Sequence, residues 1–153
     1  MKRLSWKYIA GLIDGEGCLD VLVSQGVYVS PRVRIALVKP SSFILEMLQT
    51  NHGGGCYERK GSGNHQDSVC WELSGYKLVC PFLRNFSNHL FLKKEQARFL
   101  LWMEQNIKGQ QVGTEVRDAI REELKAMKLD PQRLSEKAQE RIIKLLGCDS
   151  PIG

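Results

Sequence analysis

The sequence predicts an α+β fold: one domain in which helices alternate with pairs of antiparallel strands, followed by two more helices. Its length of 153 residues is typical of one domain. Apolar residues make up 42% of the chain and charged residues 25%, as in globular proteins. Short segments of alternating polarity separate longer segments with helical spacing, which gives the order α-β-β-α-β-β-α-α before the last two helices.

The first half of the chain contains recognisable start and turn signals. Ser5 is a candidate N-cap for the first helix, and Ser24-Gln25-Gly26 is a candidate turn between two strands. Pro40 fits the first turn of the next helix, which a run of three glycines ends. The elements expected here are a helix over 5–15, strands over 18–24 and 27–38, and a helix over 40–51.

The second half begins with another hairpin and continues with helices. Thr114 is a candidate cap, and Asp130, Pro131 and Gly147 fit the N-cap, first position and C′ position of the last helix. The expected elements are strands over 56–60 and 66–74, then helices over 75–90, 93–108, 114–128 and 131–146.

Charge and cysteine usage narrow the class of protein. The net charge of +5 lies wholly in residues 1–113, since residues 114–153 hold eight basic and eight acidic side chains. An uneven basic field suggests a polyanionic partner. The five cysteines, without a C-x-x-C pair, predict no disulfide framework and favour a reducing compartment. With no export signal and no apolar run near 18 residues, we expect an intracellular protein without a membrane partner.

The strand expected over 27–38 has two distinct faces. Its valines and Ile35 alternate with polar side chains, so the polar residues share one side of the sheet. The second hairpin repeats the pattern, with Val69, Trp71 and Leu73 expected to face the core. One face of the sheet is therefore expected to be apolar and the other polar and cationic.

The first helix carries the most informative residues. Its apolar side chains cover nearly the whole circumference, which predicts a partner on one side in addition to the core. Gly11 and Gly15 are four residues apart, on one face, where they allow two backbones to approach closely. Asp14 and Glu16 lie at the C-terminal end, where the helix dipole disfavours acids and a divalent cation would reverse this effect. The alternative is that both are ordinary solvated acids in a turn.

The nonapeptide over 9–17 resembles the signature of the LAGLIDADG homing endonucleases. Residues 10–14, the acidic position of Glu16, and Gly17 fit that signature, while Ile9 and Gly15 are mild variants. The element order over 5–90 is similar to the family core, and residues 91–97 resemble the segment with the family's active-site lysine. The resemblance covers residues 1–108 as an endonuclease core, which leaves 109–153 as a C-terminal helical extension of the same domain. A single motif implies a homodimer that packs the two first helices together.

The resemblance implies a site-specific endonuclease that makes a double-strand break in a long DNA target. Mg²⁺-dependent phosphodiester hydrolysis would leave short 3′ overhangs, with Glu16 and the Gly15 carbonyl as metal ligands. Lys93, with Lys94 as runner-up, matches the lysine near the scissile phosphate. Many relatives carry a polar residue after the second strand; here Lys39 is the candidate catalytic residue in its place, the alternative being that the site lacks this group. No small-molecule cofactor is implied, and the compartment would be a bacterial cytoplasm, a chloroplast or a mitochondrion.

In this reading the two hairpins form a saddle over the major groove, which admits a two-stranded ribbon. Candidate base contacts are Ser24, Gln25, Tyr28, Ser30, Arg32, Arg34, Lys60, Gln66, Ser68, Cys70 and Glu72. Candidate phosphate contacts are Arg59, Lys94, Arg98, Lys108 and Arg117. The expected dimer interface consists of Ile9, Ala10, Gly11, Ile13 and Asp14.

One competing function stays open. The same fold is compatible with a DNA-binding regulator without cleavage or with an RNA intron maturase. The acidic Glu16 favours a nuclease, whereas the replacement of the usual polar residue by Lys39 favours the binding proteins. A zinc site made from His52, Cys56 and nearby residues has none of the standard ligand spacings.

Overall fold

The computed structural model describes residues 2–148 and confirms the α+β class and the order of elements. The elements are α1 (Trp6–Glu16), β1 (Gly17–Ser24), β2 (Tyr28–Val38), α2 (Phe43–His52), β3 (Gly55–Arg59), β4 (Ser68–Ser74), α3 (Tyr76–Phe86), α4 (Lys94–Asn106), α5 (Thr114–Leu129) and α6 (Ser135–Cys148). Between residues 2 and 148, no helix is both long and apolar enough to cross a bilayer.

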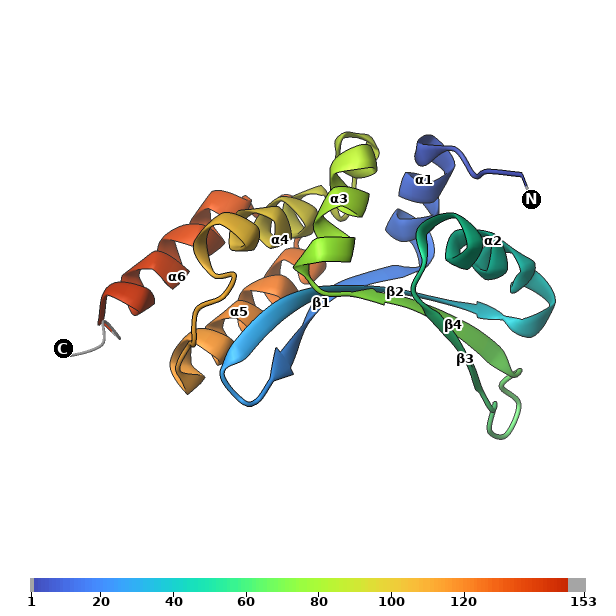
Figure 1. Cartoon of the computed structure of the whole chain (residues 1–153), viewed down its shortest axis with the longest axis horizontal. Helices are drawn as coiled ribbons and strands as arrows, with labels where there is room; N and C mark the ends of the chain where they lie inside the picture. Colours follow the sequence, from blue (N-terminus) through green and yellow to red (C-terminus); the bar gives the residue numbers. More distant parts are fainter. Residues whose placement is uncertain (1, 149–153) are drawn as a thin grey trace.

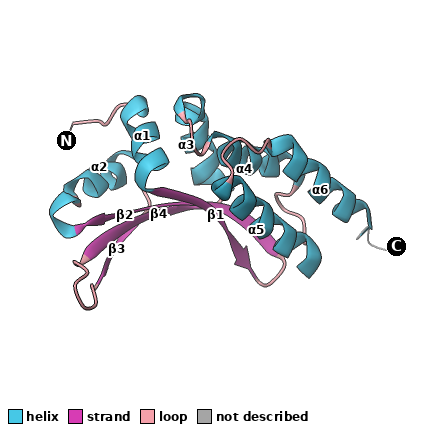
Figure 2. Ribbon diagram, turned by 180° about the vertical axis from the view of Figure 1, so that it is seen from behind, coloured by secondary structure: helices cyan, strands magenta, loops and turns pink. Residues whose placement is uncertain are grey.

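The four strands form one antiparallel sheet in the order β1-β2-β4-β3. The sheet arches like a saddle, the helices pack above the arch, and its underside carries none of the described helices (Figures 1 and 2). Strand side chains alternate between these two faces. The fold therefore leaves one long face of the sheet open to a partner.

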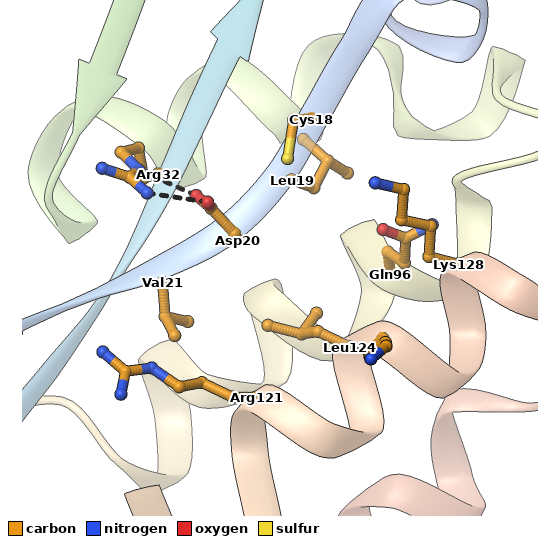
Figure 3. A pocket seen from close by; sticks show the side chains of 10 residues that line it. Cys18, Leu19, Asp20, Val21, Arg32, Gln96, Arg121, Leu124 and Lys128 are labelled. Carbon is orange, nitrogen blue, oxygen red and sulfur yellow. Dashed lines mark hydrogen bonds and ion pairs between the residues drawn. The ribbon is translucent and has the colours of Figure 1, made fainter. Parts of the chain in front are cut away.

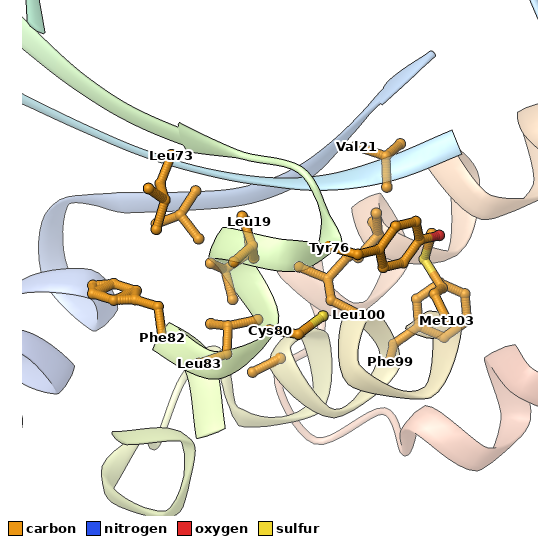
Figure 4. Packing of buried hydrophobic residues seen from close by; sticks show 14 of the residues in the cluster. Leu19, Val21, Leu73, Tyr76, Cys80, Phe82, Leu83, Phe99, Leu100 and Met103 are labelled. Carbon is orange, nitrogen blue, oxygen red and sulfur yellow. The ribbon is translucent and has the colours of Figure 1, made fainter. Parts of the chain in front are cut away.

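The core lies between the sheet and the helices. Odd-numbered positions of β2 and β4, such as Val33, Ile35 and Trp71, are fully buried there. Apolar residues of α3 and α4 pack against them, among them Leu83 and Phe99 (Figure 4). Side chains of α5 and α6 belong to the same cluster, so the C-terminal helices share this core. The alternation expected for β2 and β4 is thus the arrangement found.

Helix α1 lies over the middle of the sheet. The Ser5 hydroxyl caps it by accepting a hydrogen bond from the Tyr8 N–H at 3.1 Å, as the sequence predicts. At its other end the helix passes into β1 without a loop, because Glu16 is the last helical residue and Gly17 the first strand residue. Asp14 and Glu16 therefore lie at a rigid junction between helix and sheet.

Several expected boundaries are wrong by a few residues. Helix α2 begins at Phe43, since Pro40 lies in a separate 3₁₀ turn, and α3 ends at Phe86 before a second such turn. Thr114 is the first residue of α5, and its N-cap is Gly113. The turn between β1 and β2 uses a positive φ at both Gln25 and Gly26.

The start of the last helix is the largest error. Asp130 accepts a hydrogen bond from the Gln132 N–H in a local turn, and α6 begins only at Ser135. The Ser135 N–H donates to the Glu95 carboxylate of α4 at 2.9 Å, so a distant side chain caps this helix. Gly147, expected just beyond the helix, lies inside it.

Candidate active site and nucleic-acid interface

Glu16 is exposed at the junction of α1 and β1. Its carboxylate makes no hydrogen bond or ion pair with any residue that the structure describes. Gly17 makes the tight junction possible, because its N–H caps Ile13 O and an added Cβ would lie 2.8 Å from that oxygen. The helix has no basic residue in its last turn to balance the dipole. The carboxylate is therefore free to bind a cation.

A hollow of about 160 Å³ opens beside Glu16 on the underside of the sheet. Two guanidinium groups and one carboxylate converge on it, and the floor consists of small side chains from the strands. Its lining residues are Glu16, Cys18, Arg34, Ala36, Arg59 and Cys70. Such a combination suits an anion bound beside a metal.

Lys93 is held against the same end of α1 by Asp14. The Asp14 carboxylate accepts hydrogen bonds from the backbone N–H groups of Phe91, Leu92 and Lys93 at 2.7, 3.2 and 3.0 Å. In return, the Lys93 ammonium donates to the Asp14 carbonyl at 2.8 Å. Burial lowers the pKa of Lys93, and the nearby carboxylates of Asp14 and Glu16 oppose this effect. Lys94, by contrast, is exposed as the first residue of α4.

The donors near Glu16 fit Mg²⁺ only in part. Among residues 2–148 there is no cluster of three or more His, Cys, Asp or Glu side chains able to hold a metal. One subunit offers one carboxylate and the backbone of Gly15, an exposed position in the last turn of α1. Mg²⁺ commonly takes one or two carboxylates and keeps waters and phosphate oxygens. These donors would hold Mg²⁺ only together with waters and phosphate oxygens from a ligand.

Lys39 lies in a different hollow from Glu16. Its ammonium pairs with the Glu58 carboxylate at 3.3 Å, and both side chains line a cavity between α2 and β3. The residue of this segment that lines the Glu16 hollow is Ala36. The structure thus does not bring Lys39 together with Glu16.

Four charged side chains form a network across the underside of the sheet. The Asp20 carboxylate of β1 binds Arg32 through two hydrogen bonds, at 2.8 and 2.7 Å, and Arg34 through one at 2.8 Å. Glu72 of β4 lies 3.7 Å from the other end of Arg32. The two arginines expected to read bases are therefore oriented by acids before any ligand arrives.

The remaining candidate DNA contacts differ in accessibility. Tyr28, Ser30, Ser68 and Glu72 are partly exposed strand residues, and side chains nearer the hairpin ends are exposed: Ser24, Gln25, Arg59, Lys60 and Gln66. Cys70 lies on the same face, but only 1% of its surface is exposed, so it offers no contact to a base. Arg98, Lys108 and Arg117 come from the helical side, where Arg98 pairs with Glu95 and Glu136.

Helix α5 carries a basic stripe that the sequence analysis did not predict. Arg121, Lys125 and Lys128 line a hollow of about 310 Å³ between α5 and β1, opposite Asp20 and Arg32 (Figure 3). The neutral total charge of residues 114–153 concealed this stripe, since Glu122 and Glu123 of the same helix pair with Arg133 and Arg141 further along the chain. The spacing of 121, 125 and 128 along a helix is the signal that could have revealed it.

The interface residues expected on α1 need a correction. Ile9, Ala10 and Ile13 are 0%, 1% and 0% exposed, because they pack into the subunit's own core. The Asp14 carboxylate is likewise used within the subunit. The open face of α1 consists of Lys7, Tyr8, Gly11 and Gly15, and a Cβ added at either glycine would meet no atom within 4 Å.

The saddle-shaped sheet carries a free carboxylate, a lysine and two arginines near its centre, a combination suited to a nuclease site. The family model of the LAGLIDADG endonucleases matches residues 9–106 of this chain. The chain therefore belongs to the LAGLIDADG endonuclease family, as its nonapeptide suggests. No curated protein matches the chain.

Solved structures of homing endonucleases share this fold. One is I-CvuI in complex with DNA, with 22% identity, a TM-score of 0.65, and coverage of 92% of this chain and 93% of that one. Another is the meganuclease I-SmaMI bound to DNA, with 25% identity, a TM-score of 0.55, and coverage of 86% and 49%. A third is I-AabMI bound to DNA, with 19% identity, a TM-score of 0.54, and coverage of 69% and 37%.

Proposed function

We propose that this protein is a homodimeric, site-specific endonuclease that cuts both strands of a DNA duplex with the aid of Mg²⁺. The observation that carries the proposal is the free carboxylate of Glu16, in a hollow that it shares with Arg34 and Arg59. The related fold of I-CvuI binds DNA targets in the presence of 2 mM Mg, where the DNA is not cleaved, and of 2 mM Ca, which supports a divalent cation at such a site. Each copy of Glu16 would serve one strand, and the products would carry short 3′ overhangs.

The residues of the chain divide the chemistry among them. Glu16 and the Gly15 carbonyl would hold the cation, and bound Mg²⁺ would activate a water and neutralise charge on the phosphate. Lys93, fixed by Asp14, presents a partly desolvated ammonium group at the same end of α1. Preorganised cations of this kind stabilise charge that develops in the transition state.

The open underside of the sheet would bind the duplex. The exposed hairpin residues offer polar groups to the major groove, which a β-ribbon can enter. The stripe of Arg121, Lys125 and Lys128 on α5 extends the cationic surface beyond β1. We assign these three side chains to phosphate contacts, which position the duplex without reading its sequence.

The second copy would pack on the open face of α1. Gly11 and Gly15 leave room for a second backbone, and a symmetric pair brings two Glu16 carboxylates near one axis. The match with about half of I-SmaMI supports a single chain as half of the working unit. Cys18, Cys56, Cys70 and Cys80 are free thiols, which supports action in a bacterial cytoplasm or an organelle.

The test is cleavage of a randomised duplex library with Mg²⁺, comparing the parent with Glu16→Gln. A matched control is Glu140→Gln, an exposed glutamate on α6. We expect parent and control to cut at a preferred sequence, and Glu16→Gln to bind the same duplex without cutting. Equal cutting by Glu16→Gln would remove Glu16 from the mechanism.

A regulator or maturase is the second candidate, favoured by one observation. Ala36 lines the Glu16 hollow, while Lys39 is paired with Glu58 elsewhere. If the parent retains a defined duplex or RNA in a salt-sensitive manner and never cuts it, this second function replaces the first.

A further inference from the structure

The hydrogen-bonding capacity of the two central arginines differs sharply. Arg32 uses Nε and Nη2 for the Asp20 carboxylate, and its Nη1 faces Glu72 at 3.7 Å. An arginine reads guanine through two parallel donors, and that edge of Arg32 is already covered. Arg32 is therefore an anchor in the network, because its Nε–Nη2 edge is occupied by Asp20.

Arg34 keeps unused hydrogen-bond donors. Nη2 binds Asp20 at 2.8 Å and lies 4.0 Å from the Cys18 sulfur, while its Nε is buried without any acceptor among the described residues. A buried donor without a partner is costly, and such groups commonly await a ligand, ion or water. The Arg34 guanidinium therefore has a hydrogen-bond donor that the described residues do not satisfy.

The position of Arg34 indicates which ligand completes it. Arg34 lines the hollow that contains Glu16, together with Arg59 of β3. Arg34 lies opposite Cys18 in the β1–β2 register, and Cys18 is only two residues beyond Glu16. A planar guanidinium matches the oxygens of a phosphate, and two of them here line the same hollow as the free Glu16 carboxylate.

We propose that Arg34 is a catalytic residue that binds the scissile phosphate beside Glu16, and that Asp20 is the positioning residue that aims it. This inference rests on the endonuclease function proposed above and moves Arg34 from the base contacts to the reacting phosphate. It also supplies a polar group to a hollow in which the β2 segment otherwise offers only Ala36.

Arg59 of β3 is the second guanidinium group that lines the hollow. Its guanidinium lies 5.6 Å from the centre of the Tyr57 ring, and Nη2 donates to the Tyr57 hydroxyl at 3.2 Å. Arg59 is exposed and sits at the end of β3, so it can move toward a bound phosphate. The rigid, acid-held Arg34 therefore sets the position of the phosphate, and Arg59 closes on it.

The test uses the duplex that the parent cuts best from a randomised library. Single-turnover cleavage is measured with enzyme in excess, and affinity is measured without metal over a range of salt. For Arg34→Gln we expect the rate to fall roughly 100-fold, as for loss of one preorganised donor. The salt dependence of binding should lose about two counterions per dimer, while the preferred sequence stays the same. Arg84→Gln, which breaks an exposed ion pair between α3 and α4, is the matched control.

Asp20 gives a second and independent readout. Asp20→Asn removes a negative charge from the surface that binds DNA, so affinity at low salt should stay equal or rise. The cleavage rate should nevertheless fall, by up to about 100-fold, because Arg34 loses its orientation. Asp20→Glu keeps a carboxylate and should recover part of that rate. Arg34→Lys keeps the charge without the planar fork and should lie between parent and Arg34→Gln.

Three outcomes would overturn the inference. A changed base preference with an unchanged rate for Arg34→Gln would make Arg34 a base reader. Equal losses of rate and thermal stability in Arg34→Gln, Arg34→Lys and Asp20→Asn would make the network merely structural. Absence of cutting by the parent would instead overturn the endonuclease function, and the inference would fall with it.

Discussion

Replacing Gly11 by leucine should stabilise a single subunit and weaken its dimer. Gly11 lies in the middle of α1 on its open face, and a Cβ there would meet no atom of the subunit within 4 Å. Glycine is a poor helix former, so leucine costs the isolated fold nothing and improves its helix. A dimer that packs α1 against its copy at this point, however, has no room for the new side chain.

The two effects can be estimated separately. Leucine in place of glycine favours the helix by up to about 1 kcal/mol, which raises the Tm of a chain of this size by roughly 2–4 °C. Overpacking a close contact costs about 1–3 kcal/mol. Because the symmetric interface contains the change twice, the dimer loses roughly 2–6 kcal/mol, so its Kd rises by about 30-fold to 10⁴-fold. The two terms have opposite signs and are measured independently.

The assay combines mass and thermal stability over a dilution series. The parent should sediment at twice the mass of one 17.4 kDa chain and show a Tm that depends on concentration. Gly11→Leu should sediment as one chain, with a Tm that does not depend on concentration. Gly147→Leu makes the same change at an open, exposed helical position of α6 and should leave the dimer intact.

The decisive result concerns the mass of the variant. If Gly11→Leu remains a dimer with the affinity of the parent, the open face of α1 is not the interface. If the variant is a monomer that still cuts both strands as fast as the parent, one chain is the complete enzyme. The first result would refute the reasoning from Gly11 and Gly15, and the second would refute the proposal that two subunits form the working enzyme.

Three further predictions concern stability and binding. Burial acts to raise the pKa of Glu123, but hydrogen bonds from Arg133 and Arg141 outweigh burial and lower this pKa. Glu123→Gln should therefore reduce the free energy of unfolding by about 1–3 kcal/mol at neutral pH. A carboxyl group whose pKa is lowered in the folded state stabilises the fold at pH values above its ordinary pKa of 4.5. The loss of unfolding free energy in Glu123→Gln relative to the parent should therefore shrink as the pH falls below 4.5. A loss that stays constant in urea titrations from pH 7 to pH 3 would contradict this prediction. Tyr76→Phe leaves the Val29 carbonyl without its 2.7 Å partner and should cost about 1–3 kcal/mol in the same titrations, whereas an unchanged midpoint would contradict the hydrogen bond. Lys125→Gln combined with Lys128→Gln should weaken binding to every duplex equally and flatten its salt dependence; an unchanged slope would remove α5 from the DNA surface.

Local patterns predicted the fold and much of the site. The alternation along β2 and β4 determines which side chains face the core, and Ser5 caps α1 as expected. These features depend on neighbours within a few residues, so the sequence is sufficient to find them. The nonapeptide located Glu16 for the same reason.

Long-range contacts explain what the sequence could not predict. Helix α6 starts at Ser135 because Glu95 on α4 caps it, and no local pattern contains that residue pair. Asp14 seemed available to a partner, yet three N–H groups from residues 91–93 occupy its carboxylate. Arg32 and Arg34 are equivalent in a strand pattern, and only their different contacts with Asp20 and Glu72 distinguish them.

The absence of a loop between α1 and β1 has a consequence for how such a protein could acquire a new target. Glu16 is joined directly to the sheet through Gly17, where any larger residue would collide with Ile13. The Glu16 carboxylate, the proposed catalytic group, and the strands beneath it therefore move as one rigid body. Substitutions at the exposed hairpin ends, near Gln25 or Gln66, can change which bases are met while the carboxylate keeps its place. If Glu16 and the hairpins act as proposed, mutation can change DNA recognition without changing cleavage, although both depend on a single small sheet.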